Sequence, residues 1–337
     1  MNDLENKIKA AIQSQKAFSI FKKPDENEIR ILTDDKSGKN RFLMHSFDSK
    51  TEVSVSDSNP LIVKPSEFQI SSDICPGLQP SGLLRPLNQD QYRQLVLRTV
   101  EEINKTDIRK IVISRVKIIE NHNYRLFELF LRLTEMYPSA LVYFWNDPNG
   151  ESWMGATPEL LLSKNGNQLK TVSLAGTKKP EAEWTAKEID EQQIVTDYIL
   201  DAMKDLPDLE SKGPETVSAG KFQHLKSYIS ATAPDDLNLS ELLEKLHPTP
   251  AVCGLPKKEA FDFIIQNECY KRGFYTGYIG FENQDSSEYF VNLRCAQIFR
   301  DSLSIYVGGG ITADSQPDRE WDETEMKSGT VLNALIS

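Results

Sequence analysis

Apolar residues recur at helical spacing in some stretches of the chain and at strand-like spacing in others. Between Asn88 and Asp107, apolar side chains three and four residues apart predict a helix that Asn88 caps. A nearly continuous apolar run at 110–119 follows and predicts a buried strand. Helical spacing returns at 126–133 and stops near Pro138. The first half of the chain therefore mixes helices with strands.

Strand-like patterns are common in the rest of the chain. Residues 153–177 predict a hairpin, with Asn165 and Gly166 in its turn. A long polar helix is expected at about 182–204. Three further strands are expected at 274–282, 289–299 and 302–308.

Residues 1–87 hold a leading polar helix and short apolar strands, which we expect at the outside of a sheet. No linker, internal repeat or shift of composition divides the sequence. The predicted fold class is therefore α+β, with one large domain over residues 1–337 built from β-sheets packed with helices.

A glycine-rich and acidic stretch at 308–327, GGGITADSQPDREWDETEMK, is the most distinctive part of the sequence. We expect its three glycines to end an apolar strand at 303–307 and to aim backbone N–H groups at an anion before a helix begins. Glu320 and Glu323 would share one helix face, with Lys327 one turn beyond Glu323. Such a group could hold a hard cation together with an anionic substrate. On these residues alone, a solvated Glu323–Lys327 salt bridge explains the pattern equally well.

The composition narrows the classes of partner. The chain of 337 residues is 39% hydrophobic and 26% charged, as an ordinary globular protein is, and its net charge is -11. This charge, without a basic cluster, argues against nucleic acid as a partner. We see no signal peptide and no apolar run of membrane-spanning length, so we expect a cytoplasmic protein with no membrane partner. The four cysteines lack C-x-x-C spacing, which favours reduced thiols over disulfides or zinc: Cys75, Cys253, Cys269 and Cys295.

Seven motifs within residues 88–336 resemble those of the chorismate-utilising enzymes, and more closely those of the isochorismate synthases. Each motif is short, but all seven occur in the order of the family, which makes the resemblance specific. Residues 1–87 match only in general character. The motifs are KIVISR (110–115), GATPELLL (155–162), LAGT (174–177), LHPTPAVCGLP (246–256), YTGYIG (275–280), NLRCA (292–296) and GGGI…EWDETEMK (308–327).

The resemblance implies magnesium-dependent conversion of chorismate to isochorismate, in which water adds at ring carbon 2 as the hydroxyl at carbon 4 leaves. It implies that Lys110 is the general base for water and that Glu159 is the general acid for the leaving hydroxyl. Burial fits both roles, since it lowers the pKa of a lysine and raises that of a carboxyl. Without the resemblance, a strand-edge lysine that reaches solvent would be the favoured interpretation of Lys110, and a solvated carboxylate that of Glu159, over the catalytic roles.

The resemblance also implies a magnesium site. Its ligands would be Glu191, on the helix after LAGT, and Glu323, with Glu188 and Glu320 one turn before each as water-mediated partners. Without the resemblance, a solvated helix face would be the favoured interpretation of Glu188 and Glu191, over a metal site. The family commonly has histidine after the helical glutamate, whereas Gln192 follows Glu191 here. A shift of register would make Glu188 the direct ligand.

Several residues are implied as substrate contacts. Arg294 has the planar, bidentate geometry that suits a carboxylate. His224 matches either a family histidine near the substrate or a structural histidine with satisfied hydrogen bonds. The other implied contacts are Gly176, Thr177, Ala251, Gly308 and Lys327.

Lys110 also bears on the choice within the family. Relatives that install ammonia use a glutaminase partner and lack this lysine, so the resemblance implies water as nucleophile and no glutaminase subunit. Ala175 stands where aminodeoxychorismate synthases have a nucleophilic lysine, which argues against a covalent mechanism. Salicylate synthase, which goes on to eliminate pyruvate, is the nearest alternative, although HPTPA is more typical of enzymes that stop at isochorismate.

An alternative of another class is a non-catalytic relative that binds a dianion. Loss of Lys110 or Glu159 would mark such a protein, and both are present. The implied substrate is therefore chorismate and the implied cofactor is Mg²⁺, and we expect a monomer or weak homodimer. Isochorismate feeds menaquinone or siderophore biosynthesis, and the sequence leaves both open.

Overall fold

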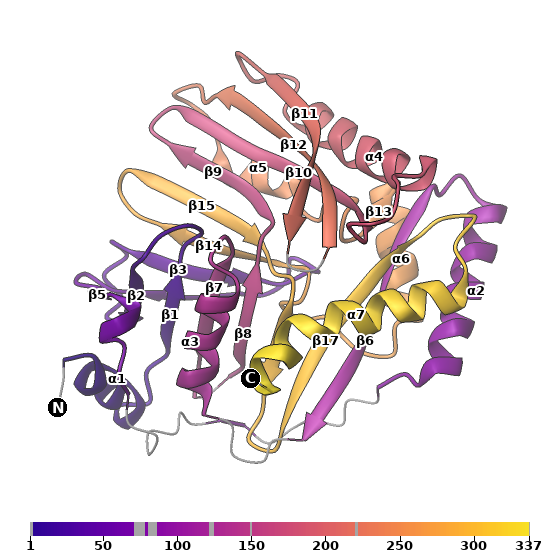
Figure 1. Ribbon diagram of the computed structural model, residues 1–337. Coiled ribbons are helices and arrows are strands. Elements are labelled where there is room, and N and C mark those ends of the chain that lie inside the picture. Colours follow the sequence, from indigo (N-terminus) through magenta and orange to yellow (C-terminus); the bar gives the residue numbers. More distant parts are fainter. Residues whose placement is uncertain are drawn as a thin grey trace.

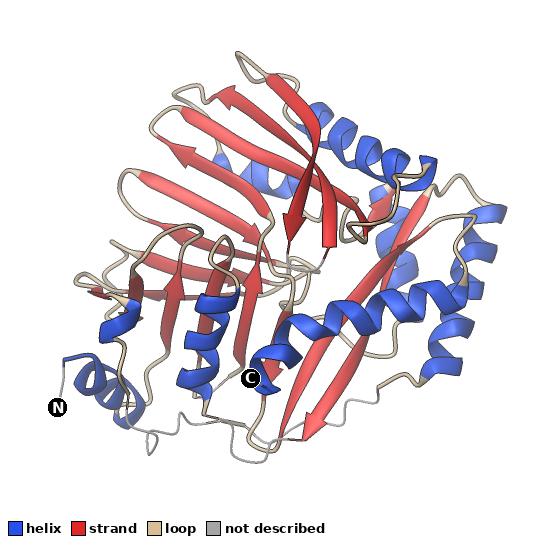
Figure 2. Cartoon of the chain, viewed as in Figure 1, coloured by secondary structure: helices blue, strands red, loops and turns tan. Residues whose placement is uncertain are grey.

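Two large antiparallel sheets and their covering helices make up the protein (Figure 2). The computed structural model describes residues 3–70, 78–79, 86–120, 125–148, 150–219 and 222–336. This architecture agrees with the predicted α+β class. Within these residues, no helix has both the length and the apolar character that crossing a bilayer requires.

The first sheet has nine strands in the order β13-β6-β17-β16-β8-β7-β1-β2-β5. Strands from both ends of the chain therefore lie in one sheet, and β17 pairs with β6 over its whole length. The strands are β1 Phe18–Lys22, β2 Ile29–Thr33, β5 Leu61–Val63, β6 Lys110–Glu120, β7 Leu141–Asn146, β8 Ser152–Thr157, β13 Gly254–Leu255, β16 Cys295–Ile298 and β17 Ser302–Ile311.

The second sheet has eight strands in the order β11-β12-β10-β9-β15-β14-β3-β4. Its hairpin between β9 and β10 turns at Gly166, whose φ of 56° suits glycine, and confirms the predicted turn. The predicted hairpin of 153–177 is too long, because residues 153–157 belong to β8 of the first sheet. The strands are β3 Arg41–His45, β4 Glu52–Ser56, β9 Leu160–Asn165, β10 Gln168–Lys178, β11 Glu210–Ala219, β12 Phe222–Thr232, β14 Tyr278–Glu282 and β15 Ser286–Val291.

Helices cover the outer faces of both sheets. In Figure 1, α7 lies across β17 and β6 beside α2, whereas α4 lies against β10 and β12. Asn88 caps α2 as predicted, since its side chain accepts from the Gln91 N–H at 2.9 Å and the Gln91 side chain accepts from the Asn88 N–H at 3.0 Å. The helices are α1 Asp3–Gln13, η1 Pro65–Glu67, α2 Gln89–Lys105, α3 Leu126–Met136, α4 Ala186–Ala202, α5 Leu239–Leu246, α6 Lys257–Asn267 and α7 Pro317–Ile336.

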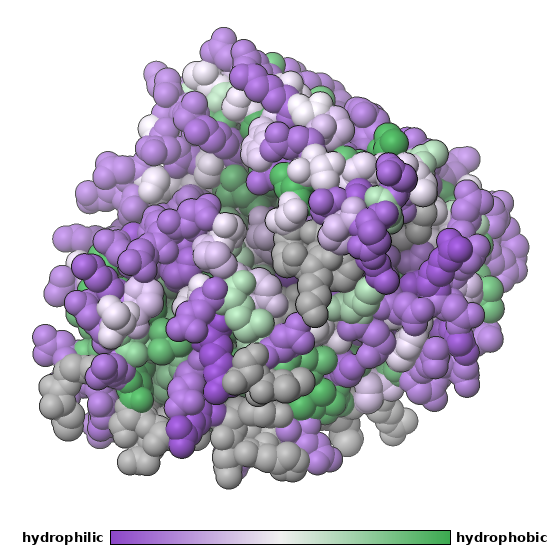
Figure 3. Space-filling view, viewed as in Figure 1, coloured by the Kyte–Doolittle hydropathy of each residue, from purple (hydrophilic) through white to green (hydrophobic). Residues whose placement is uncertain are grey.

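An aromatic core joins the two sheets. Phe42 of β3 stacks on Trp145 of β7 with ring centres 6.1 Å apart, and Phe21 of β1 packs against Phe281 of β14 at 5.0 Å. All except Phe281 are fully buried. Burial of each such ring contributes about 1.5–3 kcal/mol, so this contact fixes one sheet on the other. Outside the core, hydrophilic side chains cover most of the face seen in Figure 3.

The N-terminal strands lie at the outer ends of the sheets, as predicted. β1, β2 and β5 form one end of the first sheet, and β3 and β4 form one end of the second. These strands thus extend both sheets beyond the strands that carry the motifs of 88–336, and side chains of β1, β2, β3 and β4 are part of the aromatic core.

Two of the points at which the chain crosses from one sheet to the other contain residues singled out in the sequence. One crossing lies between β8 and β9 and contains Glu159, and the other lies between β15 and β16 and contains Arg294. The single strand predicted at 289–299 is therefore wrong. The chain breaks there because Asn292 is tied by hydrogen bonds to Tyr143 and to the Phe274 carbonyl, and Arg294 has a φ of 50°.

The glycines of the 308–327 stretch also differ from the prediction. Gly308, Gly309 and Gly310 lie inside β17 and pair with Ser114, Ile113 and Val112 of β6. They neither end the strand nor form an anion-binding turn, because none of the three has a positive φ.

The strand predicted at 274–282 is shorter than expected. It begins only at Tyr278, after a turn in which Thr276 has a φ of 58°. A side chain at Gly277 would lie 1.9 Å from the carbonyl oxygen of His45, so this turn packs directly on the backbone of β3.

Candidate active site

A cavity of about 370 Å³ lies where the two sheets meet, between α4 and α7. Its volume is within the usual range for a small-molecule site, roughly 300–1,000 Å³. Of the predicted residues, Glu320 does not line it, and the side chain of Thr177 is outside the described part of the structure. The predicted residues that line it are Lys110, Glu159, Gly176, Glu188, Glu191, His224, Ala251, Arg294, Gly308, Glu323 and Lys327.

An open strand edge forms one side of the cavity. β17 pairs with β16 only from Leu303 to Ile305, while it pairs with β6 as far as Ile311. Beyond Ile305, no described strand covers the edge that faces away from β6. The Gly308 carbonyl on this edge accepts a hydrogen bond from Lys327 Nζ at 3.1 Å. Polar backbone and a cation therefore face the same space.

The glycines of β17 are explained by what lies above them. A Cβ atom on Gly310 would lie 2.6 Å from Lys110 Cε and 3.3 Å from Glu191 Oε1. A Cβ atom on Gly308 would lie 2.7 Å from the Ile113 carbonyl oxygen and 3.0 Å from the Tyr275 hydroxyl. Any residue with a Cβ atom at 310 would clash with Lys110, so only glycine lets the lysine side chain lie against the strand.

Lys110 and Glu159 both lie in the wall of the cavity and are almost fully buried, at 3% and 6% exposure. Burial raises the pKa of the Glu159 carboxyl to about 7, although the charges of Lys110, Arg294 and Lys327 oppose the rise. A carboxyl with this pKa holds its proton part of the time at neutral pH. It can therefore donate a proton, as a general acid must.

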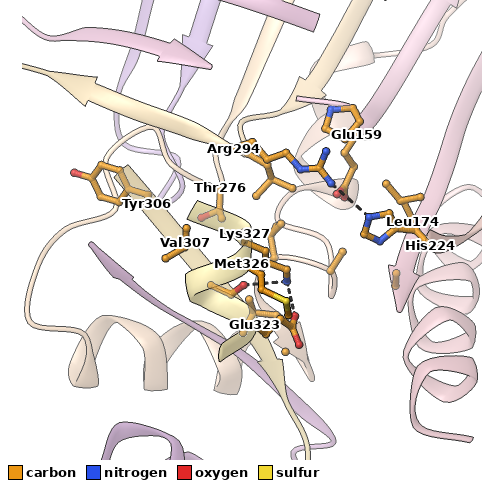
Figure 4. A pocket seen from close by; sticks show the side chains of 18 of the residues that line it. Glu159, Leu174, His224, Thr276, Arg294, Tyr306, Val307, Glu323, Met326 and Lys327 are labelled. Carbon is orange, nitrogen blue, oxygen red and sulfur yellow. Dashed lines mark hydrogen bonds and ion pairs between the residues drawn. The ribbon is translucent and has the colours of Figure 1, made fainter. Parts of the chain in front are cut away.

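His224 and Arg294 form a connected pair beside Glu159 (Figure 4). His224 Nδ1 lies 3.0 Å from the Gly176 carbonyl oxygen, so this nitrogen carries the proton. Its Nε2 then accepts from Arg294 Nη2 at 3.4 Å. Burial and the nearby Arg294 charge lower the pKa of His224 to about 4, despite its bond to Gly176. His224 is thus neutral and orients the guanidinium from behind.

Gln192 determines which face of α4 meets the cavity. Its buried amide accepts from the Ala175 N–H at 2.9 Å and donates to Ser173 Oγ at 2.8 Å, both on β10. With Gln192 turned toward β10, Glu188 and Glu191 line the cavity. The two differ in their bonds, because the Glu188 carboxylate accepts from the Thr185 N–H at 3.0 Å in a capping box.

On α7, Glu323 forms an ion pair with Lys327 at 2.6 Å, and both are about one-third exposed to the cavity. Figure 4 shows the two side chains together with Met326 on one side of the cavity. Glu320 lies behind them, 2% exposed, and accepts from Ser315 Oγ at 2.7 Å.

Arg115 of β6 holds α7 in this orientation. Its guanidinium lies 3.9 Å from the centre of the Trp321 ring, and its Nε donates to Thr324 Oγ1 at 2.8 Å. It also pairs with Glu325. These contacts fix the face of α7 opposite to Glu323 and so keep that carboxylate at the cavity.

The carboxylates suit a hard cation such as magnesium. A Cβ atom on Gly309 would lie 3.3 Å from Glu320 Oε2 and 3.9 Å from Glu323 Oε1, and one on Gly310 would lie 3.3 Å from Glu191 Oε1. Because neighbouring residues of a strand point to opposite faces, carboxylates of α7 and α4 approach β17 from its two sides. In the described part of the chain, no three acidic, histidine or cysteine side chains are close enough to form a complete metal cage. Magnesium usually takes only one or two carboxylates and keeps water or substrate oxygens, so these residues fit it.

The sequence missed several residues of the cavity wall. Tyr275, Thr276 and Tyr306 lie there, and the ring of Tyr275 stacks on that of Tyr306 with centres 5.3 Å apart. The YTGYIG motif contains the first two, but its pattern predicts a strand in place of the turn that brings them to the cavity. Val112, Leu293 and Met326 add apolar surface.

Fold and cavity together describe an enzyme-like site for a small anion, and comparison with known proteins identifies the family. The sequence profile described as chorismate binding enzyme matches residues 76–336. Isochorismate synthase DhbC of Bacillus subtilis is 34% identical over 269 residues, which cover 73% of this chain and 68% of the relative. The protein belongs to the chorismate binding enzymes.

Two solved structures share the fold. A Bacillus anthracis protein described as a 2,3-dihydroxybenzoate-specific isochorismate synthase, DhbC, superposes with a TM-score of 0.80 at 23% identity, over 99% of both chains. MenF, the menaquinone-specific isochorismate synthase of Escherichia coli, superposes with a TM-score of 0.78 at 20% identity, over 99% of this chain and 91% of the other.

The raised pKa of Glu159 predicts a pH-dependent effect on stability. The folded protein keeps this proton up to about pH 7, whereas an ordinary glutamate loses it near pH 4.5. The free energy of unfolding therefore decreases by up to about 3 kcal/mol as the pH rises through this interval. Glu159→Gln has no proton to lose. We expect its melting temperature, relative to that of the wild type, to be higher at pH 8 than at pH 5.

The matched control is Glu135→Gln, at an exposed position of α3. Its melting temperature should differ from the wild type by the same small amount at both pH values. A Glu159→Gln variant that behaves like this control would show that Glu159 titrates as an ordinary carboxyl.

Proposed function

We propose that the protein is an isochorismate synthase, an isomerase that converts chorismate to isochorismate by adding water at ring carbon 2 with loss of the carbon 4 hydroxyl. The observation that carries this proposal is the pair formed by a buried lysine, Lys110, and a buried carboxyl with a pKa of about 7, Glu159, in one cavity. The reaction needs one base and one acid. The relatives named isochorismate synthase support the choice of reaction.

Cationic residues of the chain would bind the substrate, and a base and an acid would transfer the protons. Arg294, oriented by His224, and Lys327 supply positive charge for the carboxylates of the substrate. Lys110 accepts the proton of the attacking water, and Glu159 gives a proton to the departing hydroxyl. The surrounding apolar wall, including Val112 and Leu293, limits access of other water.

Magnesium completes the site in this proposal. Glu191 and Glu323 would hold the ion, with Glu188 and Glu320 as partners through water. When bound, the ion balances the charge of the ring carboxylate and helps to orient it. Two features favour Glu191 over Glu188 as a direct ligand: its Oε1 lies close above Gly310, and the Glu188 carboxylate already caps α4.

The same proposal also covers the domain organisation, the location, the partners and the pathway of the protein. Both sheets contribute to one cavity, so we treat residues 1–337 as one catalytic domain in the cytoplasm, active as a monomer or weak homodimer. Water as nucleophile requires no glutaminase partner. The names of the relatives include both menaquinone-specific and siderophore-type isochorismate synthases, so the product would enter one of these pathways.

The reaction itself gives the first prediction from this proposal. Purified protein incubated with chorismate and Mg²⁺ should give a mixture of chorismate and isochorismate, as resolved by chromatography. The reaction should stop when EDTA removes the metal, and it should need no glutaminase. Salicylate with pyruvate as the main product would instead assign the protein to the salicylate synthases, and anthranilate formed from ammonium would contradict water as the nucleophile.

Lys110 gives the second prediction. Lys110→Gln should lower turnover by about 100-fold or more, as loss of a general base does, while chorismate still binds. Gly310→Ala should have a similar effect, because its methyl group would displace Lys110 Cε. Lys117→Gln is the matched control, since Lys117 is on the same strand but outside the cavity, and its turnover should stay within about twofold. Near-normal turnover of Lys110→Gln would show that the water is activated elsewhere.

The carboxylates give the third prediction. Glu191→Gln and Glu323→Gln should each weaken magnesium binding, measured by calorimetry, by more than about 100-fold because a charged ligand is lost. Glu188→Gln and Glu320→Gln should cost about 10- to 100-fold, as residues behind the ligands usually do. Glutamine at 188 can still complete the capping box, so the helix start is preserved. A larger loss for Glu188→Gln than for Glu191→Gln would make Glu188 the direct ligand.

A further inference from the structure

A buried ion pair lies next to the cavity and has no part in the chemistry above. The side chains of Arg272 and Glu268 are 2% and 1% exposed, and their contact is bidentate, with Nη2 to Oε1 at 2.6 Å and Nε to Oε2 at 2.8 Å. Burial opposes the charge of Arg272, but Glu268 raises its pKa above the usual value. Such a pair adds little net stability compared with apolar packing, so geometric specificity is the better explanation for it.

The pair takes the place of a neighbouring strand along β6. The short strand β13 pairs only with Lys110 and Ile111, after which the Val112 N–H donates to the Cys253 carbonyl at 2.7 Å. Further along the same edge, the Val112 carbonyl accepts from Arg272 Nη2 at 2.7 Å. The Ser114 N–H then donates to Glu268 Oε1 at 2.7 Å. The two side chains thus continue the backbone ladder of the strand that begins with Lys110.

Arg272 also reaches two other walls of the cavity. Its Nη1 donates to the Val252 carbonyl at 2.9 Å and to Thr276 Oγ1 at 3.2 Å, and both residues line the cavity. Its guanidinium lies 4.5 Å from the centre of the Phe47 ring, which keeps it flat. One planar group therefore joins β6, the 251–252 segment and the turn at 275–276.

We propose that the Glu268–Arg272 pair is the positioning unit of the active site, which fixes the strand of Lys110 relative to the 251–252 and 275–276 walls and so controls turnover. This role rests on the proposed function. Only a guanidinium has enough fixed donors to serve the carboxylate, two backbone carbonyls and a hydroxyl together. Misplacement of a reacting group by about 1 Å can cost about 100-fold in rate, so loss of these bonds should reduce the rate even in a folded protein.

Arg272→Lys tests the proposal, because lysine keeps the charge next to Glu268 but cannot reach the other acceptors at the same time. We expect kcat for chorismate to fall by about tenfold or more while KM stays within about threefold, since Arg294 and Lys327 are unchanged. Circular dichroism and the melting temperature establish that the variant is folded at the assay temperature. A folded Arg272→Lys protein with wild-type kcat and KM would overturn the proposal.

Lys22→Met is the matched control for loss of a buried cation. Lys22 is 3% exposed and donates to the Pro138 carbonyl at 2.8 Å, but it is on β1 and does not line the cavity. Its variant should lower the melting temperature and leave kcat unchanged. If Lys22→Met lowers kcat as much as Arg272→Lys does, general destabilisation explains the loss of kcat in both variants, and the positioning role is overturned.

Tyr270→Phe provides a second test that removes no charge. The Tyr270 hydroxyl lies 2.7 Å from Ser114 Oγ, which itself donates to Glu268 Oε1 at 2.8 Å. If Arg272→Lys does not fold, Tyr270→Phe should still lower kcat by about threefold at constant KM, and an unchanged kcat would refute the role. Wild-type protein without activity on chorismate would refute the proposed function, whereas active wild type with an equally active Arg272→Lys would refute the positioning role alone.

Discussion

The cavity depends on the point at which β16 stops pairing with β17. Because the chain leaves the first sheet at Arg294, β17 is left with an open edge from Tyr306 onward, while β6 supports its other edge. Backbone polar groups at such an edge must find partners, and Lys327 supplies one for Gly308. The same interruption that opens a space between the sheets therefore also places polar groups at its border.

Burial then sets the charges of the site. Glu159 lies at the other crossing between the sheets, where desolvation raises its pKa to about 7 even though three cationic side chains oppose this. The same desolvation keeps His224 neutral, so that it can accept a hydrogen bond from Arg294. One physical cause, the low polarity of the space between the sheets, therefore keeps the proton on Glu159 and lets neutral His224 orient Arg294 toward an anion.

Two ion pairs with the same sequence spacing differ in burial, and burial decides whether each pair can bind a ligand or holds the backbone in place. Glu323 and Lys327 face the cavity and are about one-third exposed, so their contact contributes only about 0.3–0.5 kcal/mol and can yield to a ligand. Glu268 and Arg272 have the same i,i+4 spacing, but their side chains are almost fully buried. Each guanidinium nitrogen of Arg272 donates to an acceptor within the protein. The first pair is therefore suited to binding and the second to geometry.

The sequence by itself determined the elements whose signals are local. The cap at Asn88, the turn at Gly166 and the apolar run of β6 depend on residues close together in the chain, and the motif order was enough to indicate the family. Only the tertiary structure decided why β17 contains glycines, because the atom that excludes a side chain at Gly310 belongs to Lys110. The pairing of strands far apart in the chain also decided where 289–299 breaks and which ion pair is buried, since burial is a property of the packed sheets.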